Sequence, residues 1–593
     1  MRMRLVVAFI FLFFVLLLSR VYYLSIKSNV YYEELARQNS IKTEYLVPTR
    51  GEILDRNGSI LAMNDLGFSI ALKPYLSIKK EHRGKLELEI AKLQEHFPDL
   101  NATILVRNYK RADSYYNQDF IEVIDFLSYD EISPHFSQLS QNENIRIIPT
   151  TKRKYPYGKL ASHIIGYTQK ANLQDISENE IAKLTNYTGK SGIERYYNEI
   201  LQGQKGERVY KVNAFNQVLE ELSYKDSSSQ DISLSIDIAL QSYLSEIFAD
   251  NSGAAVIMDA YNGEILAASS FPEYDPNPFV RGISTKDWKA LIENLDHPFT
   301  NRLVNANYPP GSVVKMGVGL AFLNSNSINT ATEFYCSGSV ELAGRNFRCW
   351  NRSGHGSMDL KHAIKHSCDV YFYEGSLKVG IDLIASTLSR IGFGAKTGVD
   401  LPNEFVGVVP SKEWKMQRYK KPWYQGETLN TSIGQGNFLV TPMQIAKYTA
   451  QIATGEEVSP HFLKDKNLSS PKEVFTLFEK SQLPYIRNSM YAVANEQGGT
   501  AYRYLNHLPI KVAAKTGTAQ VIGFSQADKN RVNEAELKYY TRSHTWITSY
   551  APYNKPRYVV TILLEHGGKS TTTGILTAQI YQKMFQMGYF KNQ

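Results

Sequence analysis

The longest apolar pattern in the chain lies at its N-terminus. Leu5 to Leu18 are all apolar, Ser19 and Arg20 interrupt the run, and Val21-Tyr-Tyr-Leu24 continues it. About 20 such residues span a bilayer core as a helix, and an arginine near the end can extend toward the headgroups. The residues around Ser19 are too large for a signal-peptidase site. We therefore predict an uncleaved anchor, with a cytoplasmic tip and transmembrane helix over residues 1–25.

Residues 26–230 are polar and mixed, without another apolar run of that length. Short strand-like runs alternate with turns, and Asn57-Gly58 is a clear turn because both residues tolerate a positive φ. A serine-rich break at 227–229 ends the region. This pattern predicts a separate α+β domain over residues 26–230.

From residue 231 onward, strand-like patterns stand at both ends and helical patterns lie between them. Gly253–Asp259 and Glu264–Ser269 are apolar runs joined by a turn, and His544–Tyr550 and Arg557–Glu565 are strand candidates near the other end. Because the strands come from both ends, we predict one sheet built from distant segments and flanked by helices over residues 231–593. The fold class is α/β in the broad sense (α+β).

Size and charge fit this division but narrow the function only slightly. A chain of 593 residues is too long for one compact domain. The formal net charge of +8 is spread along the chain and suits an anionic surface such as phospholipid or cell-wall polymer. Without a helix-turn-helix or zinc-finger spacing, the composition gives no reason to expect nucleic acid as a partner.

Ser312-Val-Val-Lys315 is the first candidate for catalysis. On a helix, residues three apart share a face, so the lysine amine can reach the serine hydroxyl. Tyr308-Pro-Pro-Gly311 breaks the chain just before, which predicts Ser312 at a helix N-terminus, where backbone N–H groups can stabilise an oxyanion. The same spacing also occurs at Ser77-Ile-Lys-Lys80, so the motif alone is weak evidence.

Two later motifs strengthen the case for Ser312. Ser367-Cys-Asp369 lies in a helix-like region, and Lys515-Thr-Gly-Thr518 follows a predicted strand. A lysine and a hydroxyl on an edge strand can bind a substrate carboxylate, and Gly517 lets a substrate backbone lie close. A second Lys-Thr-Gly at Lys396-Thr-Gly398 has no preceding strand and a proline soon after, so we interpret it as a structural turn.

The three motifs in this order resemble the active-site signature of penicillin-binding proteins and serine β-lactamases. Further segments resemble class B penicillin-binding proteins, and within them the elongation-type penicillin-binding protein 2, where aspartate often stands third in the second motif. These segments are Arg50–Gly58, Gly192-Ile-Glu194, Gly253–Asp259, Asp275-Pro-Asn277, Tyr371-Phe-Tyr373, Ile433-Gly-Gln-Gly436 and Thr441-Pro442. The resemblance implies an antiparallel sheet flanked by helices as the transpeptidase domain, preceded by an N-terminal α+β pedestal and one transmembrane helix.

The resemblance also implies a reaction: D,D-transpeptidation that cross-links peptidoglycan stem peptides during cell elongation and is sensitive to penicillin. Ser312 would attack D-Ala-D-Ala with Lys315 as its base, and Ser367 would relay a proton to the leaving amine. The amides of Ser312 and Thr518 would hold the oxyanion, and Lys515, Thr516 and Thr518 the terminal carboxylate. Asp369 would orient Lys515 or hold a helix in place. No cofactor is required for this chemistry.

Location, partners and alternatives follow from the same resemblance. It implies a single-pass protein of the inner membrane with its bulk in the periplasm. Expected partners are stem peptides, β-lactams, the membrane, a polytopic glycosyltransferase of the shape, elongation and division family, and a rod-shape scaffold protein. A division-type paralogue, a β-lactam-binding sensor and a β-lactamase or D,D-carboxypeptidase are the alternatives. Gly426 stands where class A β-lactamases carry their deacylating glutamate, with Glu427 one residue out of register, so slow deacylation is expected.

The chain has three cysteines, Cys336, Cys349 and Cys368, and His355 lies between the last two. Three thiolates and one imidazole make a closed tetrahedral zinc site. Two cysteines could instead form a disulfide in an oxidising compartment, or all three could be plain packing residues. If zinc is bound, it is structural and joins this loop to the segment that carries Ser367 and Asp369.

Overall fold

A computed structural model of the chain describes residues 2–27, 40–79, 84–117, 119–213, 217–466, 472–522 and 533–591. The chain forms two compact units, each built from separate stretches of sequence. One comprises residues 1–51, 171–188 and 199–230, and the other residues 52–170, 189–198 and 231–593. The chain therefore passes from one unit to the other several times.

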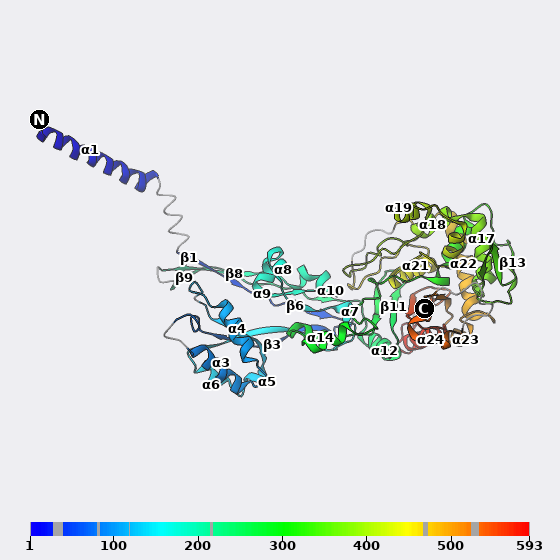
Figure 1. Cartoon of the computed structure of the whole chain (residues 1–593), viewed down its shortest axis with the longest axis horizontal. Coiled ribbons are helices and arrows are strands. Elements are labelled where there is room, and N and C mark those ends of the chain that lie inside the picture. Colours follow the sequence, from blue (N-terminus) through cyan, green and yellow to red (C-terminus); the bar gives the residue numbers. More distant parts are fainter. Residues whose placement is uncertain are drawn as a thin grey trace. The chain divides into compact units, whose positions relative to one another are not determined.

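The first unit contains the N-terminal helix α1 (Arg2–Tyr22), drawn in dark blue in Figure 1. The apolar span Met3–Lys27 has a mean hydropathy of 2.6, and within the described ranges no other helix is long and apolar enough to cross a membrane. The same unit holds an antiparallel sheet in the order β1 (Ile41–Leu46), β8 (Gly206–Val212) and β9 (Val218–Lys225).

The second unit begins with a sheet centred on the long strand β3 (Ile60–Leu72). Strands β4 (Ile121–Ser128) and β5 (Ile145–Lys154) pair with β3 antiparallel. Helices α3 (Lys85–His96) and α4 (Ala102–Ala112) add apolar side chains to the core over this sheet. Strands β2 (Ile53–Leu54) and β10 (Ile232–Ser233) pair in parallel at its margin.

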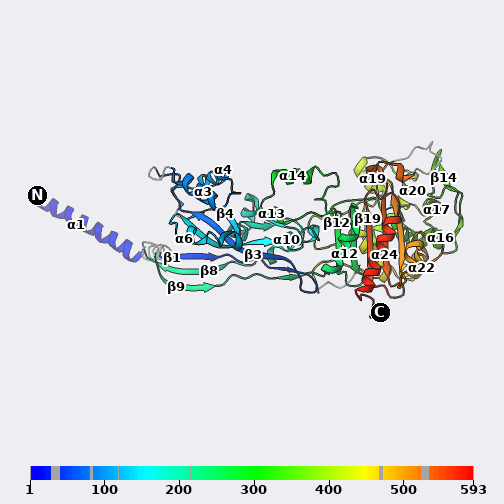
Figure 2. The ribbon, with the colours of Figure 1, turned by 90° about the horizontal axis from the view of Figure 1, so that it is seen from below.

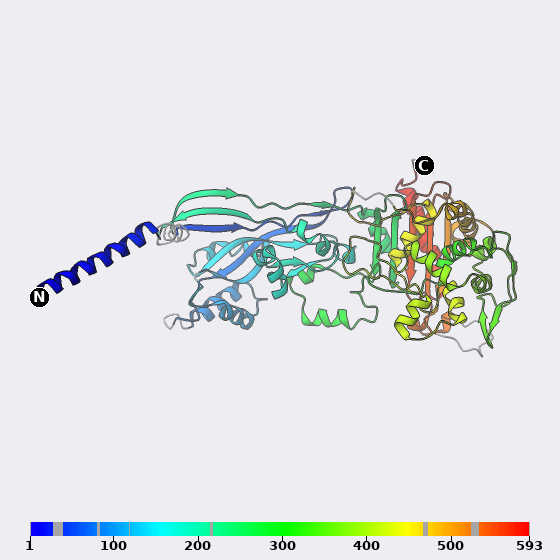
Figure 3. The ribbon, with the colours of Figure 1, turned by 90° about the horizontal axis from the view of Figure 1, so that it is seen from above.

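The larger sheet of this unit has the order β12-β11-β19-β18-β17, and every pair is antiparallel. Its strands are β11 (Gly253–Asp259), β12 (Ile265–Phe271), β17 (Ala513–Ala519), β18 (His544–Ala551) and β19 (Tyr558–Leu564). Figures 2 and 3 show the early strands, in green, beside the late ones, in orange to red. The prediction of one sheet from distant segments is therefore confirmed.

Strands β11, β12 and β19 are buried along their whole length, because helices cover both faces of this sheet. Helices α12 (Ile238–Phe248) and α24 (Thr571–Gln586) contact each other and pack on one side, and α21 (Pro442–Thr454) packs on the other (Figure 1). Helix α22 (Leu477–Asn495) packs against β17. As the last strand in the order, β17 leaves one edge without a partner in this sheet.

Candidate active site

Ser312 lies where the chain passes from an extended segment into a buried helix. It occupies the 3-10 turn Gly311–Val314, and α15 (Lys315–Leu323), which is buried throughout, follows directly. Gly311 has a φ of +56°, and a Cβ there would lie 2.6 Å from the carbonyl oxygen of Thr518. Only glycine accepts both conditions, so the turn carrying Ser312 packs tightly on β17. The expected helix start is shifted by one turn, since Ser312 precedes the α-helix itself.

Ser367 and Cys368 lie in the turn between α16 (Leu360–Lys365) and α17 (Asp369–Val379), and not within the helix that the sequence suggested. Ser367 has a φ of +55°, a conformation that a residue with a side chain rarely adopts. Its N–H donates to the Ile364 carbonyl at 3.2 Å, and the turn aims both its carbonyl and its hydroxyl at lysines. Strain of this kind concentrates at functional sites.

The Lys515–Thr518 motif is part of strand β17 rather than following a strand. Gly517 faces the Ser312 turn, because a Cβ there would lie 3.1 Å from a Val313 side-chain carbon and 3.2 Å from the Pro310 carbonyl oxygen. The structure thus gives Gly517 a packing role, beyond the close approach of substrate that its sequence suggested. Lys515, on the same face of the strand, is fully buried.

Hydrogen bonds join the three motifs into one network. The Lys315 amine donates to the Ser367 carbonyl at 3.0 Å and to Asp369 Oδ1 at 2.7 Å. The Lys515 amine donates to Ser367 Oγ at 2.9 Å and to the Thr516 carbonyl at 2.8 Å. Asp369 therefore pairs with Lys315 and not with Lys515, which answers the question that the sequence left open. The Lys315 backbone N–H donates to the Ser312 carbonyl, but among the described residues no hydrogen bond joins the Lys315 amine to the Ser312 hydroxyl.

The two buried lysines make this an electropositive site. Burial lowers the pKa of Lys515 well below the usual range for a lysine, and the neighbouring charge of Lys315 lowers that pKa further, while Asp369 opposes both effects. A buried cation of this kind gains from an anion that enters the site. A substrate carboxylate next to Lys515 would supply that charge.

A second buried network holds the segment before Ser312. The Tyr308 hydroxyl donates to Glu565 Oε1 at 2.6 Å, and Arg302 Nη2 pairs with Glu565 Oε2 at 2.7 Å. The Tyr308 ring packs edge-on against His544, with centroids 5.5 Å apart. Burial is the main reason why the pKa of His544 falls to about 4, so this imidazole is neutral near pH 7. His544 is thus a packing residue beside the site.

Three residues that the motifs did not include also touch the site. The Gln435 side-chain amide donates to the Thr518 carbonyl at 3.1 Å, and Thr500 Oγ1 lies 2.7 Å from Thr516 Oγ1. The backbone N–H of Trp350 donates to Asp369 Oδ2 at 2.9 Å. Gln435 belongs to the Ile433–Gly436 segment, so the sequence offered a signal for it. Thr500 follows α22 in an ordinary loop, and no sequence pattern singles it out.

The rival motifs have other partners. Ser77 Oγ donates to Asp113 Oδ2 at 2.6 Å, and Lys80 lies outside the described residues. In the second Lys-Thr-Gly, Lys396 is exposed, and the Thr397 and Gly398 amides donate to Glu404 at 2.7 and 3.1 Å. Neither motif meets a second catalytic group among these contacts.

The four residues proposed as metal ligands converge. One ligand atom each of Cys336, Cys349, His355 and Cys368 lies within 4.8 Å of all the others. His355 Nδ1 is 3.6 Å from Cys336 Sγ and 3.5 Å from Cys349 Sγ, close to the ~3.5–3.8 Å between ligands of a tetrahedral zinc ion. All three thiols are free, without a disulfide. The donor set therefore fits a tetrahedral metal.

Comparison with known proteins agrees with this geometry. The "Penicillin binding protein transpeptidase domain" family matches residues 253–586, and the "Penicillin-binding Protein dimerisation domain" family matches residues 45–234. The chain is 33% identical to Peptidoglycan D,D-transpeptidase MrdA of Salmonella typhimurium, over 98% of this chain and 95% of that protein.

Solved structures give the same result. The structure titled "Complex between Penicillin-Binding Protein (PBP2) and MreC from Helicobacter pylori" aligns with a TM-score of 0.86 and 42% identity, over 93% of this chain and 99% of that one. A second, titled "Structural coordination of polymerization and crosslinking by a peptidoglycan synthase complex", aligns with a TM-score of 0.69 and 26% identity over 98% of both. The chain belongs to the class B penicillin-binding proteins, in the penicillin-binding protein 2 group of peptidoglycan D,D-transpeptidases.

Proposed function

We propose that this chain cross-links peptidoglycan stem peptides during cell elongation through an acyl-enzyme on Ser312. The observation that carries the proposal is the position of Ser367. Its carbonyl binds the lysine three residues after Ser312, and its hydroxyl binds the lysine of β17, so one turn connects all three motifs. A serine, two buried lysines and an open strand edge suit acyl transfer from an extended peptide.

In the proposed reaction, the Lys315 ammonium first loses a proton to solvent. Ser312 Oγ then attacks the D-Ala-D-Ala carbonyl, and its proton passes to the neutral Lys315 amine. Amides of Ser312 and Thr518 hold the oxyanion. Ser367 passes a proton to the departing amine, and D-alanine leaves. A side-chain amine of a neighbouring stem then attacks the ester, forms the cross-link and returns Ser312 to its free form.

The remaining residues position these groups. Lys515, Thr516 and Thr518 hold the terminal carboxylate of the donor peptide, because all three lie on the edge strand β17 and offer it a cation and two hydroxyls. Asp369 receives hydrogen bonds from the Lys315 amine and from the Trp350 N–H, so it fixes the lysine amine. We assign Asp369 a positioning role rather than direct contact with substrate.

The alternative of a β-lactamase has little support in the structure. Glu427, the carboxylate nearest in sequence to the expected deacylating position, forms an ion pair with Lys415 and caps the start of α20 (Gln425–Ser432) through the Tyr424 N–H. Glu427 Oε2 takes both contacts, so this carboxylate is tied to Lys415 and Tyr424. We propose that the penicillin adduct on Ser312 is long-lived.

A fluorescent penicillin tests the nucleophile. Wild-type protein is expected to label stoichiometrically, and Ser312→Ala protein is expected to show no label. Ser77→Ala, which removes the rival serine, is the matched control and should label like wild type. Equal labelling of wild type and Ser312→Ala would refute the proposal.

We further propose the arrangement of the chain in the cell. Residues 1–25 anchor it in the inner membrane, 26–230 form a periplasmic pedestal, and 231–593 form the transpeptidase domain. The helix α1 and the two family matches support this division. A glycosyltransferase and a rod-shape scaffold are proposed partners, since the titles of two similar structures name MreC and a peptidoglycan synthase complex. Co-purification with each partner, with and without residues 26–230, tests this.

Zinc is the metal we propose for the cysteine and histidine cluster. The Asp369 N–H donates to Cys349 Sγ at 3.4 Å, and Cys368 is next in sequence to both Ser367 and Asp369. A bound ion would therefore act as a structural site that fixes the turn carrying Ser367 and the start of the helix carrying Asp369. Elemental analysis of purified protein should find one zinc per chain, and Cys336→Ser should lose it. Zinc-free protein with intact thiols and full penicillin labelling would contradict the assignment.

A further inference from the structure

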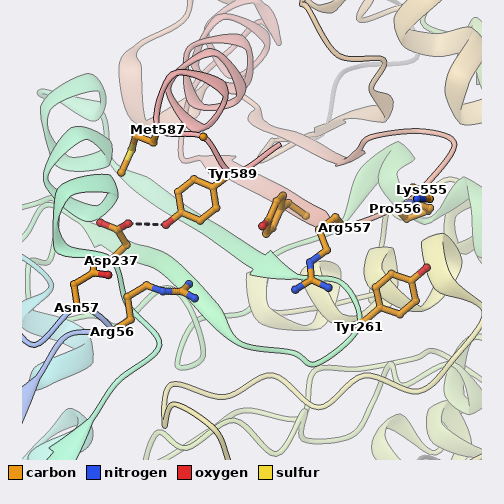
Figure 4. Close-up of a pocket in the computed structure, with 11 residues that line it drawn as sticks. Arg56, Asn57, Asp237, Tyr261, Lys555, Pro556, Arg557, Met587 and Tyr589 are labelled. Atoms are coloured by element: carbon orange, nitrogen blue, oxygen red, sulfur yellow. Dashed lines mark hydrogen bonds between the residues drawn. The ribbon is translucent and has the colours of Figure 1, made fainter. Parts of the chain in front are cut away.

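A cavity of about 700 Å³ lies in the second unit, apart from the active-site motifs. Five segments line it (Figure 4): the turn after β2, the cap of α12, the β11–β12 turn, the β18–β19 turn and the end of α24. Along β18, Ala551, the partner of Tyr558, lies six positions after Thr545, the partner of Thr518. The cavity is therefore about 20 Å along the strands from the carboxylate site.

Three cations line this cavity, and two of them have no counter-ion in the part of the chain that the structure describes. Buried Arg56 Nη1 has no hydrogen-bond partner, and Lys555 makes no hydrogen bond or ion pair within the described residues. Arg557 pairs with Asp259 at 2.7 Å yet is 44% exposed at its side chain. In Figure 4 the guanidinium groups of Arg56 and Arg557 extend toward the same space. Guanidinium donors left without acceptors in a partly buried site favour an oxyanion ligand.

Two carboxylates near the cavity, Asp237 and Asp55, already accept hydrogen bonds from other donors, and neither forms an ion pair with a cavity cation among the described residues. Asp237 accepts from the Ala239 and Leu240 N–H groups and, at 2.6 Å, from the Tyr589 hydroxyl, which is the dashed line in Figure 4. Asp55 accepts from the Asn57, Ser59 and Ile238 N–H groups. The cavity is thus lined by two cations, Arg56 and Lys555, that have no carboxylate partner among the described residues, next to carboxylates that already have donors.

Tyrosine rings form the other part of the wall. Tyr261 is 53% exposed, and Tyr558 and Tyr589 pack edge-on with ring centroids 5.5 Å apart. Such rings offer flat apolar surfaces next to the cations, as in sites for amphipathic ligands. The volume lies within the ~300–1,000 Å³ typical of ligand pockets.

We propose that this cavity binds an acidic glycopeptide, with a peptide carboxylate on Arg56, Lys555 and Arg557 and a sugar or peptide plane on the tyrosines. The choice of a glycopeptide rests on the proposed function, which places the domain against a polymer with these groups. The cavity would hold a strand that is not being cross-linked, and it would do so whether or not Ser312 is acylated.

Calorimetry with an uncross-linked disaccharide-pentapeptide tests the proposal. Full-length protein is first acylated with penicillin, so that the active site is blocked. Wild type should bind the glycopeptide, and Lys555→Gln/Arg557→Gln should bind about tenfold more weakly because two charged hydrogen bonds are lost. Arg418→Gln/Lys420→Gln, which removes the same charge from exposed positions elsewhere, should bind like wild type. Lys555→Gln alone should weaken binding without disturbing the Arg557–Asp259 pair, and thermal melting checks that each variant is folded.

Two further arms identify the ligand. Inorganic phosphate and the disaccharide without peptide should each bind more weakly than the glycopeptide. Tighter binding of phosphate would overturn the glycopeptide assignment, and equal binding by wild type and Lys555→Gln/Arg557→Gln would overturn the site. Repeating the titration with Ser312→Ala protein separates this result from the proposed function, because that variant tests the cavity even if Ser312 is not the nucleophile.

Discussion

The tripeptide Lys-Thr-Gly occurs twice in this chain, and its two copies have different surroundings. In Lys515-Thr-Gly517 the lysine is fully buried on an edge strand and donates to Ser367, and the glycine packs on the turn that carries Ser312. In Lys396-Thr-Gly398 the lysine is exposed, and the next two residues bind Glu404 of the same loop.

The difference lies in the backbone. A strand places alternate side chains on opposite faces, so Lys515 and Thr516 point to different neighbours: one to Ser367 and the other to Thr500. In the turn, Thr397 and Gly398 direct their N–H groups at one carboxylate, and Gly398 has a φ of +82°. The same three residues form part of a buried edge strand in one place and a closed loop in the other.

The largest expected contrast is between the two lysines. Lys515→Ala should lower the second-order rate constant of penicillin acylation by at least about 100-fold, as the loss of a charge that stabilises the reacting anion typically does. Lys396→Ala should stay within about twofold of wild type, because an exposed lysine without a site partner contributes little. Stopped-flow labelling measures both rate constants. A similar decrease in the two variants would contradict the different roles assigned to the two lysines.

The charge of Lys515 can be tested through Asp369. Because Asp369 raises the pKa of Lys515 against burial and Lys315, its neutralisation should lower that pKa further. If charged Lys515 binds the carboxylate, the acylation rate falls as pH rises through this pKa. Asp369→Asn should therefore move the basic limb of the pH profile to lower pH.

The matched control for that profile is Glu404→Gln, which removes a carboxylate from the other Lys-Thr-Gly. Its basic limb should coincide with that of wild type. A limb in Asp369→Asn that is unmoved, or moved to higher pH, would contradict the assigned role of Lys515.

Substitution of Thr516 should affect acylation, whereas substitution of Thr397 should affect stability. Thr516→Val removes a hydroxyl from the carboxylate site and should slow acylation about tenfold, with little change in the melting temperature. Thr397→Val removes a side-chain hydrogen bond to Glu404 and should cost about 1–3 kcal/mol of unfolding free energy with normal acylation. Chemical denaturation and labelling of the same preparations give both numbers.

The smallest effect concerns Thr500, which contacts Thr516 and not the motif lysine. Thr500→Val should slow acylation only a few-fold, since it acts through the orientation of the Thr516 hydroxyl. Thr500→Ser keeps the hydroxyl and should restore the wild-type rate. If the serine variant is as slow as the valine variant, the contact between the hydroxyls has no positioning role.

Sequence reasoning found the elements whose signal is local. The span at α1, the strands of the large sheet and the three motifs all follow from periodicity or short spacings. It missed what depends on tertiary packing. The turn at Ser367 rests on a rare left-handed backbone angle. The other two features join distant residues: Asp369 pairs with Lys315, 54 positions away, and Thr500 contacts Thr516, 16 positions away.

The cavity proposed to bind a glycopeptide could be predicted from the sequence even less. Arg56 stands about five hundred positions before Lys555 and Arg557, and the three residues meet only in the folded chain. No window of sequence contains such a site. The three motifs can thus be recognised from short stretches of sequence, whereas the cavity can be recognised only from the folded structure.

Peptide mapping of the penicillin adduct tests the central claim most directly. Full-length protein is saturated with penicillin, digested and analysed by mass spectrometry to locate the added mass. We predict one adduct per chain, on the peptide that contains Ser312, and none on peptides that contain Ser77 or Ser367. An adduct on another residue, or no adduct at saturation, would contradict the account.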